Sequence, residues 1–124
     1  MWLFVALAAL GTWTIFVPYL GRAIGLVVDV ASSVEIVDHV IPGTVVAAIS
    51  AYLAIGARRN TLPGLSRPIG GGICFLAGFW VLVTHVPLVA QAVQGKAPWG
   101  STLWHASTAL PIVALSLWMV LRDS

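Results

Sequence analysis

Four apolar segments, each long enough to cross a lipid bilayer, make up most of this 124-residue chain. They cover residues 2–20, 40–57, 69–93 and 103–121, and none of them contains Lys, Arg, Asp or Glu. A spanning helix needs roughly 20 mostly apolar residues, whereas the strands of a membrane barrel alternate in polarity over about 10 residues. The sequence therefore predicts an all-α integral membrane protein, a four-helix bundle that forms a single membrane domain over residues 1–124.

The overall composition argues against a soluble domain. Hydrophobic residues make up 60% of the chain and charged residues 8%, which is more apolar surface than a chain of this length can bury in its own core. We therefore expect the lipid bilayer to cover the remainder, together with larger membrane-protein subunits or further copies of the chain. A formal net charge of +2 is too small for a nucleic-acid-binding surface, so no nucleic-acid partner is expected.

The two halves of the chain share a Gly and a Trp in their first apolar segment, a Pro near its end and a His that opens the second segment. These pairs are Gly11 and Gly78, Trp13 and Trp80, Pro18 and Pro87, and His39 and His105. The members of each pair are 66 to 69 residues apart. This match predicts two repeated transmembrane hairpins, residues 1–59 and 69–124, joined by a hinge at residues 60–68. Because each hairpin contains an even number of spans, the repeats are expected to be parallel.

The paired residues also carry packing predictions. Gly11 and Gly78 are expected to let helices approach closely, as small residues do in membranes, and Trp13 and Trp80 to act as packing anchors. The prolines, which cannot donate a backbone hydrogen bond, are expected to mark the ends of the first and third helices. Cys74 is expected to pack as a small hydrophobic residue.

The cationic residues predict an orientation. Four of them lie on the side of the membrane that holds the termini and the hinge, and two lie on the other side. The four are Arg58, Arg59, Arg67 and Arg122, and the two are Arg22 and Lys96. Since cytoplasmic loops carry an excess of Lys and Arg, we expect a multi-pass protein of the bacterial plasma membrane with both termini in the cytoplasm.

The arrangement of Gly, Trp and Pro resembles the SPW repeat family of small bacterial membrane proteins. The residues that carry the resemblance are Gly11, Trp13 and Pro18 in the first half, and Gly78, Trp80 and Pro87 in the second. At the position of the Ser-Pro-Trp triplet this chain has Val-Pro-Tyr and Val-Pro-Leu. The resemblance implies an architecture of paired hairpins and brings no activity with it.

Three histidines are predicted to lie near the outer face, the membrane face away from the termini. His39 and His105 open the second and fourth apolar segments, and His85 lies near the end of the third. Imidazole is a common ligand for Zn, Cu and Fe. Asp38 or Glu35 could add a carboxylate, or could hold a ring by its second nitrogen.

Several interpretations of the histidines remain open. One is a metal site formed by His39, His85, His105 and Asp38, and another is a haem held between two of the imidazoles. A third is that His39 and His105 are interfacial residues that cap their helices and hydrogen-bond the outer loops. A role in protonation is the fourth.

The leading hypothesis for function is a non-catalytic accessory or scaffold membrane protein that packs against a larger membrane complex or against itself. The spanning segments contain few polar groups and the connections are too short to form an active site, so enzyme activity is not expected. The rival hypothesis is an outer-face metal- or haem-binding redox protein that uses His39, His85 and His105. A channel or carrier is disfavoured because no polar stripe follows a predicted helix.

Overall fold

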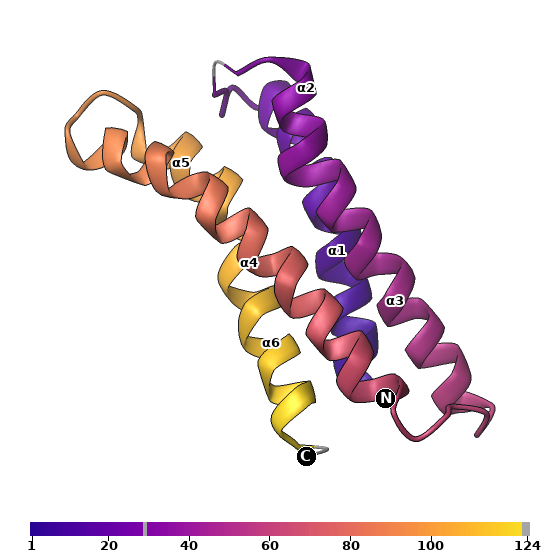
Figure 1. Cartoon of the computed structure of the whole chain (residues 1–124). Helices are drawn as coiled ribbons and strands as arrows, with labels where there is room; N and C mark the ends of the chain where they lie inside the picture. The colour runs from indigo at the N-terminus through magenta and orange to yellow at the C-terminus, as the bar shows by residue number, and fades with distance from the viewer. Residues whose placement is uncertain (29, 123–124) are drawn as a thin grey trace.

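The computed structural model describes residues 1–28 and 30–122, which form helices and short connections (Figure 1). Helix accounts for 82% of the chain, and the described residues contain no strand. The elements are α1 (Trp2–Ala23), α2 (Ser32–Glu35), the π-helix η1 (Ile36–Val40), α3 (Ile41–Arg58), α4 (Ser66–Val93), α5 (Trp99–Ala106) and α6 (Ala109–Arg122). The prediction of an all-α fold is confirmed.

Four of these helical stretches are long and apolar enough to cross a membrane. They are Trp2–Ala23, Ser32–Arg58, Ser66–Val93 and Trp99–Arg122. The second stretch joins α2, η1 and α3, and the fourth joins α5 and α6. This arrangement is that of a multi-pass membrane protein and is compatible with a four-helix bundle.

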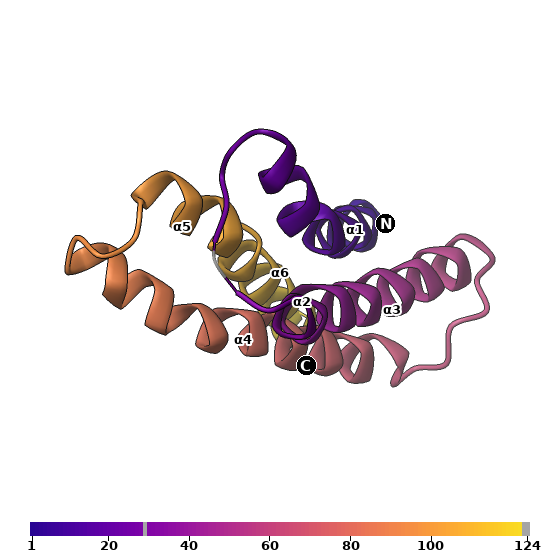
Figure 2. The same ribbon diagram turned by 90° about the horizontal axis from the view of Figure 1, so that it is seen from above.

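The most extensive helix contacts lie within each half of the chain, and smaller contacts join the two halves. α1 lies along α3, α4 lies along α6, and α3 contacts α4 between the two hairpins (Figures 1 and 2). Both termini lie at the same end as the connection between α3 and α4, whereas α2 and α5 lie at the opposite end (Figure 1). We call the first the termini end and the second, which holds the cavity described below, the cavity end.

Glycines lie where the helices of each hairpin pack closely together. A Cβ atom added to Gly11 would lie 2.5 Å from the Ala47 nitrogen and 2.8 Å from the Gly43 oxygen, both in the backbone of α3. A Cβ added to Gly78 would lie 2.6 Å from Ile112 Cγ2 in α6. Each of the two glycines matched in sequence therefore faces the second helix of its own hairpin, Gly11 against backbone and Gly78 against a side chain. The duplication of the hairpin stays a prediction.

The prolines do not end the helices as the sequence predicted. Pro18 lies inside α1, which continues to Ala23, and Pro87 lies inside α4, which continues to Val93. A proline removes one backbone donor, but spanning helices tolerate it because neighbouring helices and local adjustments satisfy the freed groups. The expectation that these prolines mark helix ends is therefore wrong.

Two other prolines coincide with irregular backbone. Pro42 is the second residue of α3, which follows the π turn of η1, and its ring would clash with the carbonyl four residues earlier in an ordinary α-helix. Hydrogen bonds from residue i to residue i+5 widen the helix at this point and relieve that clash. Pro111 stands four residues after Ser107, where the backbone turns between α5 and α6.

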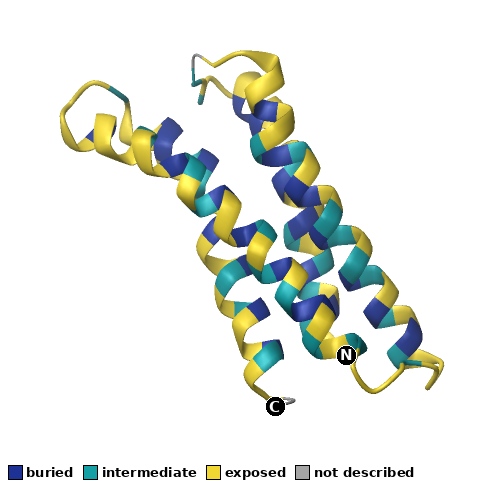
Figure 3. Ribbon diagram, viewed as in Figure 1, coloured by how far each residue is buried: buried dark blue, intermediate teal, exposed yellow. Residues whose placement is uncertain are grey.

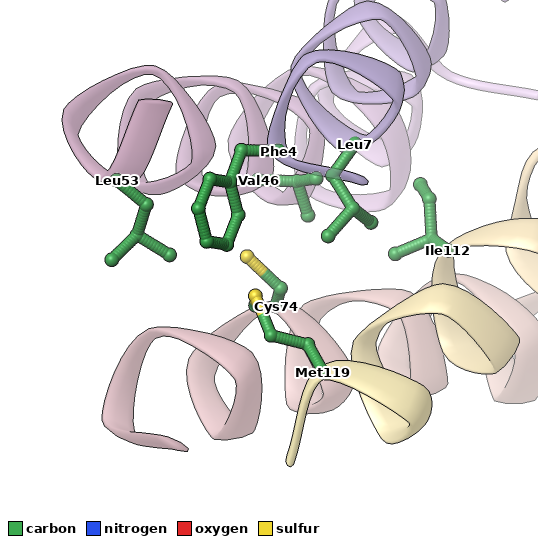
Figure 4. Packing of buried hydrophobic residues seen from close by; sticks show 7 residues of the cluster. All are labelled: Phe4, Leu7, Val46, Leu53, Cys74, Ile112 and Met119. Carbon is green, nitrogen blue, oxygen red and sulfur yellow. The ribbon is translucent and has the colours of Figure 1, made fainter. Parts of the chain in front are cut away.

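The core lies between the hairpins, toward the termini end. It is a cluster of buried apolar side chains from α1, α3, α4 and α6 (Figure 4), namely Phe4, Leu7, Val46, Leu53, Cys74, Ile112 and Met119. Cys74 is fully buried there, which confirms its prediction as a small hydrophobic residue. The outward faces of all four spans are largely exposed and apolar (Figure 3), which indicates a lipid bilayer around the bundle.

Candidate functional site

Three imidazoles from three different elements meet at the cavity end. His39 comes from η1, His85 from α4 and His105 from α5, and their exposed fractions are 3%, 5% and 3%. The ring centre of His39 lies 4.8 Å from that of His85 and 5.7 Å from that of His105, with interplanar angles of 81° and 88°. The three histidines predicted to share a membrane face are therefore in contact, with His39 in the middle.

His85 and His105 are each fixed by a hydrogen bond to their own helix. His85 Nδ1 lies 2.6 Å from the Val81 oxygen, and His105 Nδ1 lies 2.9 Å from the Ser101 oxygen. A carbonyl oxygen can only accept, so the partner assigns the proton of each neutral ring to Nδ1. Each Nε2 atom then keeps its lone pair and can accept a hydrogen bond or bind a cation.

His39 has no such restraint. Both of its ring nitrogens are buried, and neither has a hydrogen-bond partner of acceptable geometry, although the ring approaches the backbone of His105. Buried polar atoms are nearly always paired, and an unpaired one costs about 1–3 kcal/mol. Its position in a π turn is a second distinguishing feature, because such turns occur frequently at functional sites.

The three rings line a cavity of about 420 Å³, which we call the histidine cavity. Its walls also include valines of the connection between α1 and α2, polar side chains of α4 and α5, and Lys96. Two carboxylates, Glu35 and Asp38, reach it as well. The cavity thus combines imidazole nitrogens with acidic oxygens.

The two carboxylates have different surroundings. Glu35 is 3% exposed and pairs with Arg22, whose Nη2 atom donates to Oε2 at 2.8 Å. Asp38, predicted as a metal ligand, is half-buried and lies close to the Trp80 indole and to His85. The sequence suggested Glu35 as a second carboxylate, but its pairing with Arg22 was not predicted.

The prediction that His39 and His105 cap helices is wrong. His105 lies near the C-terminal end of α5 and bonds to Ser101 of the same helix, not to an outer loop. His39 lies inside a continuous helical stretch from Ser32 to Arg58. Both rings are buried, and the helical stretches that carry them begin at Ser32 and Trp99, earlier in the chain than the apolar pattern predicted.

The tryptophans predicted as packing anchors are only partly covered. Trp13 is 41% exposed and makes an edge contact with Trp104 at 5.6 Å, and Trp80 is 49% exposed. The sequence did not predict a hydrogen bond between α5 and α1, in which Trp104 Nε1 donates to the Val17 oxygen at 2.7 Å. Residues 87 positions apart leave no local sequence signal of such a contact.

The spacing of the rings bears on metal binding. Two imidazoles that share one ion at about 2.0 Å per nitrogen hold their ring centres roughly 5 to 6 Å apart, which is near the separations of His39 from His85 and His105. As the side chains stand, no group of three or more His, Cys, Asp or Glu in the described part of the chain could hold a metal ion. A three-ligand site would therefore require at least one ring to turn. No protein family, curated protein or solved structure matches this chain.

Proposed function

We propose that this chain is a non-catalytic membrane protein that binds a transition metal ion in the histidine cavity. The observation that carries the proposal is His39, which is buried with two unpaired nitrogens beside two imidazoles whose Nε2 atoms keep their lone pairs. Neutral imidazole is the commonest metal ligand in proteins and suits Zn, Cu, Fe and Ni.

His85 and His105 are the first two ligands in this proposal. Metal-binding histidines usually donate their second ring nitrogen to a carbonyl or carboxylate, which fixes the tautomer and orients the ring. Both rings already make that bond, to Val81 and Ser101. His39 is the third ligand, and its ring can turn toward the ion without breaking a hydrogen bond.

A metal ion fits this cluster better than a haem does. A haem with two axial histidines places its flat macrocycle between the two imidazoles. His39 is in edge contact with both other rings, so a macrocycle could separate it from either ring only by pushing the helices apart. A single ion requires at least one ring to turn but places no macrocycle between the rings.

The test is metal binding by the purified protein in detergent after treatment with a chelator. Co²⁺ is the probe, because its visible absorption reports coordination, and metal content by mass spectrometry gives the ratio. We expect one ion per chain in the wild type. In His85→Ala and in His105→Ala we expect a dissociation constant at least about tenfold higher. His85→Gln and His105→Gln serve where the alanine variants fail to fold.

Cys74→Ser is the matched control, since it removes the lone thiol from the core, where it lies in contact with Ser50 and outside the cavity lining. It should bind Co²⁺ like the wild type. Absence of binding to the wild-type chain would overturn the proposal, as would equal binding by the histidine variants.

The exposed apolar faces favour a second proposal, an accessory or scaffold role against a larger membrane complex or against copies of the chain. In α4 only 22% of the most apolar window is buried within the protein, and large side chains such as Leu76 and Phe79 point outward. Purification in mild detergent should then yield larger subunits or an oligomer. A uniform monomer without partners would count against this role.

We further propose that the termini end faces the cytoplasm of a bacterial plasma membrane. This proposal is supported by the position of two cationic residues. Arg58 and Arg59 lie at the C-terminal end of α3, at the end of the molecule that holds both termini (Figure 1). In a Cys74→Ser background, Asn60→Cys should resist an impermeant thiol reagent in intact cells and Lys96→Cys should react. The opposite pattern would reverse the orientation.

A further inference from the structure

We propose that Arg22 and the bound metal ion compete for the carboxylate of Glu35. In this inference, which rests on the proposed metal-binding function, Glu35 is an additional ligand of the histidine cavity that Arg22 holds back. The proposal assigns Arg22 the role of a built-in competitor that sets the metal affinity.

Glu35 shares the histidine cavity with the three imidazoles. It ends α2, directly before the π turn, and stands four residues before His39. The π turn shifts the helical register between the two residues, but both side chains line the histidine cavity. Two carboxylates therefore share the cavity with the imidazoles, and that of Glu35 is held in an ion pair with Arg22.

The ion pair is asymmetric in its exposure to solvent. Glu35 is buried, with 4% of its side chain exposed, whereas 46% of the Arg22 side chain is exposed. A buried carboxylate requires a cationic partner, because leaving it unpaired is strongly unfavourable. Arg22 stands at the last turn of α1 and can return to water or lipid headgroups at little cost.

A divalent ion in the cavity can therefore replace Arg22 without leaving Glu35 uncompensated. Carboxylate oxygens bind Zn²⁺ at about 2.0–2.2 Å and complete a tetrahedral site together with three imidazoles. The guanidinium gives up one charge-assisted hydrogen bond in the exchange, and this loss weakens the apparent affinity. Removing Arg22 should accordingly tighten metal binding.

The experiment is a double-mutant cycle on Co²⁺ binding by the full chain in detergent. Arg22→Gln should lower the dissociation constant by about tenfold, the equivalent of one hydrogen bond to a charged group. Glu35→Gln should raise it by a similar factor. In the Glu35→Gln background, Arg22→Gln should have no further effect, because nothing remains to compete for.

Two controls separate competition from a general effect of charge. Lys96 is a second cation on the cavity wall, so Lys96→Gln removes the same charge but not the ion pair and should change the affinity much less. Asp38→Asn removes a carboxylate from the cavity and should weaken binding less than Glu35→Gln does. Arg22→Lys keeps the charge and serves if the glutamine variant does not fold. We expect it to lower the dissociation constant for Co²⁺ by a few fold.

The outcomes distinguish this inference from the proposed function. If the wild type binds no Co²⁺, the metal-binding function itself fails, and the inference with it. If the wild type binds but Arg22→Gln and Arg22→Lys bind equally or more weakly, the inference fails and the function stands. The inference also fails if Lys96→Gln raises the Co²⁺ affinity as much as Arg22→Gln does. It fails as well if Arg22→Gln still raises the affinity in the Glu35→Gln background.

Discussion

Replacing His39 by Phe should stabilise the protein, although buried substitutions usually destabilise. The two nitrogens of His39 lack hydrogen-bond partners, and each unpaired buried polar group costs about 1–3 kcal/mol. Phe keeps the edge contacts with His85 and His105, removes both nitrogens, and has the histidine cavity of about 420 Å³ beside it to take up its larger ring. Two such groups amount to about 2–6 kcal/mol, so after a deduction of about 1 kcal/mol for imperfect packing we expect a net gain of at least about 1 kcal/mol.

His105→Phe provides the matched comparison. His105 has the same 3% exposure and lies in the same cluster, but its Nδ1 atom is hydrogen-bonded to the Ser101 oxygen. Loss of that bond costs about 1 kcal/mol, so the same substitution should destabilise here. The difference in sign depends only on the hydrogen bonding of the two rings.

The assay is unfolding of the purified protein by SDS in mixed micelles in the presence of a chelator. Near-UV circular dichroism follows tertiary structure, because the Trp2–Trp118 and Trp13–Trp104 contacts report on packing between helices. If His39→Phe lowers the free energy of unfolding as much as His105→Phe does, the nitrogens of His39 are not a destabilising feature. The case for an imidazole kept for binding would then lose its basis.

Two further predictions concern helix packing. Gly11→Ala should destabilise by about 1–3 kcal/mol, because the new Cβ meets α3 backbone, whereas Gly72→Ala, with open space at its Cβ, should be neutral or stabilising in the same SDS titration. Equal midpoints for the two variants would show that α1 and α3 do not cross at Gly11. Trp104→Phe removes the bond to the Val17 oxygen and should cost about 1 kcal/mol, measured by the same titration; an unchanged midpoint would show that this bond contributes nothing to stability.

The spans can be predicted from the sequence, but their ends cannot. Long runs without charge identify membrane helices because each charged side chain is expensive in lipid. Proline is a less reliable signal, since Pro18 and Pro87 lie inside helices. In water a helix can end at proline because solvent satisfies the exposed backbone, but within a bilayer the backbone has no such alternative and the helix continues.

The candidate site is only partly visible in the sequence. The apolar pattern places His39, His85 and His105 at one face, and the structure brings them into contact. The pairing of Arg22 with Glu35 depends on how the connection between α1 and α2 folds back, which no periodicity reports. The π turn likewise follows from Pro42 only once the helix is known to begin before it.

Comparison of the two sequence-matched histidines gives a physical reason for their different roles. His105 bonds to the carbonyl of Ser101, four residues earlier on a regular helix. The residue four before His39 is Glu35, but the π turn between them changes the helical register, so His39 makes no equivalent bond.

At the corresponding position, moreover, the first half of the chain has a carboxylate where the second half has a hydroxyl. One π turn and one difference between Ser and Glu are thus enough to make the site asymmetric. In our proposal, His105 is a ligand with a fixed orientation, His39 is a ligand free to turn, and Glu35 supplies the charge that only the first half offers to a cation.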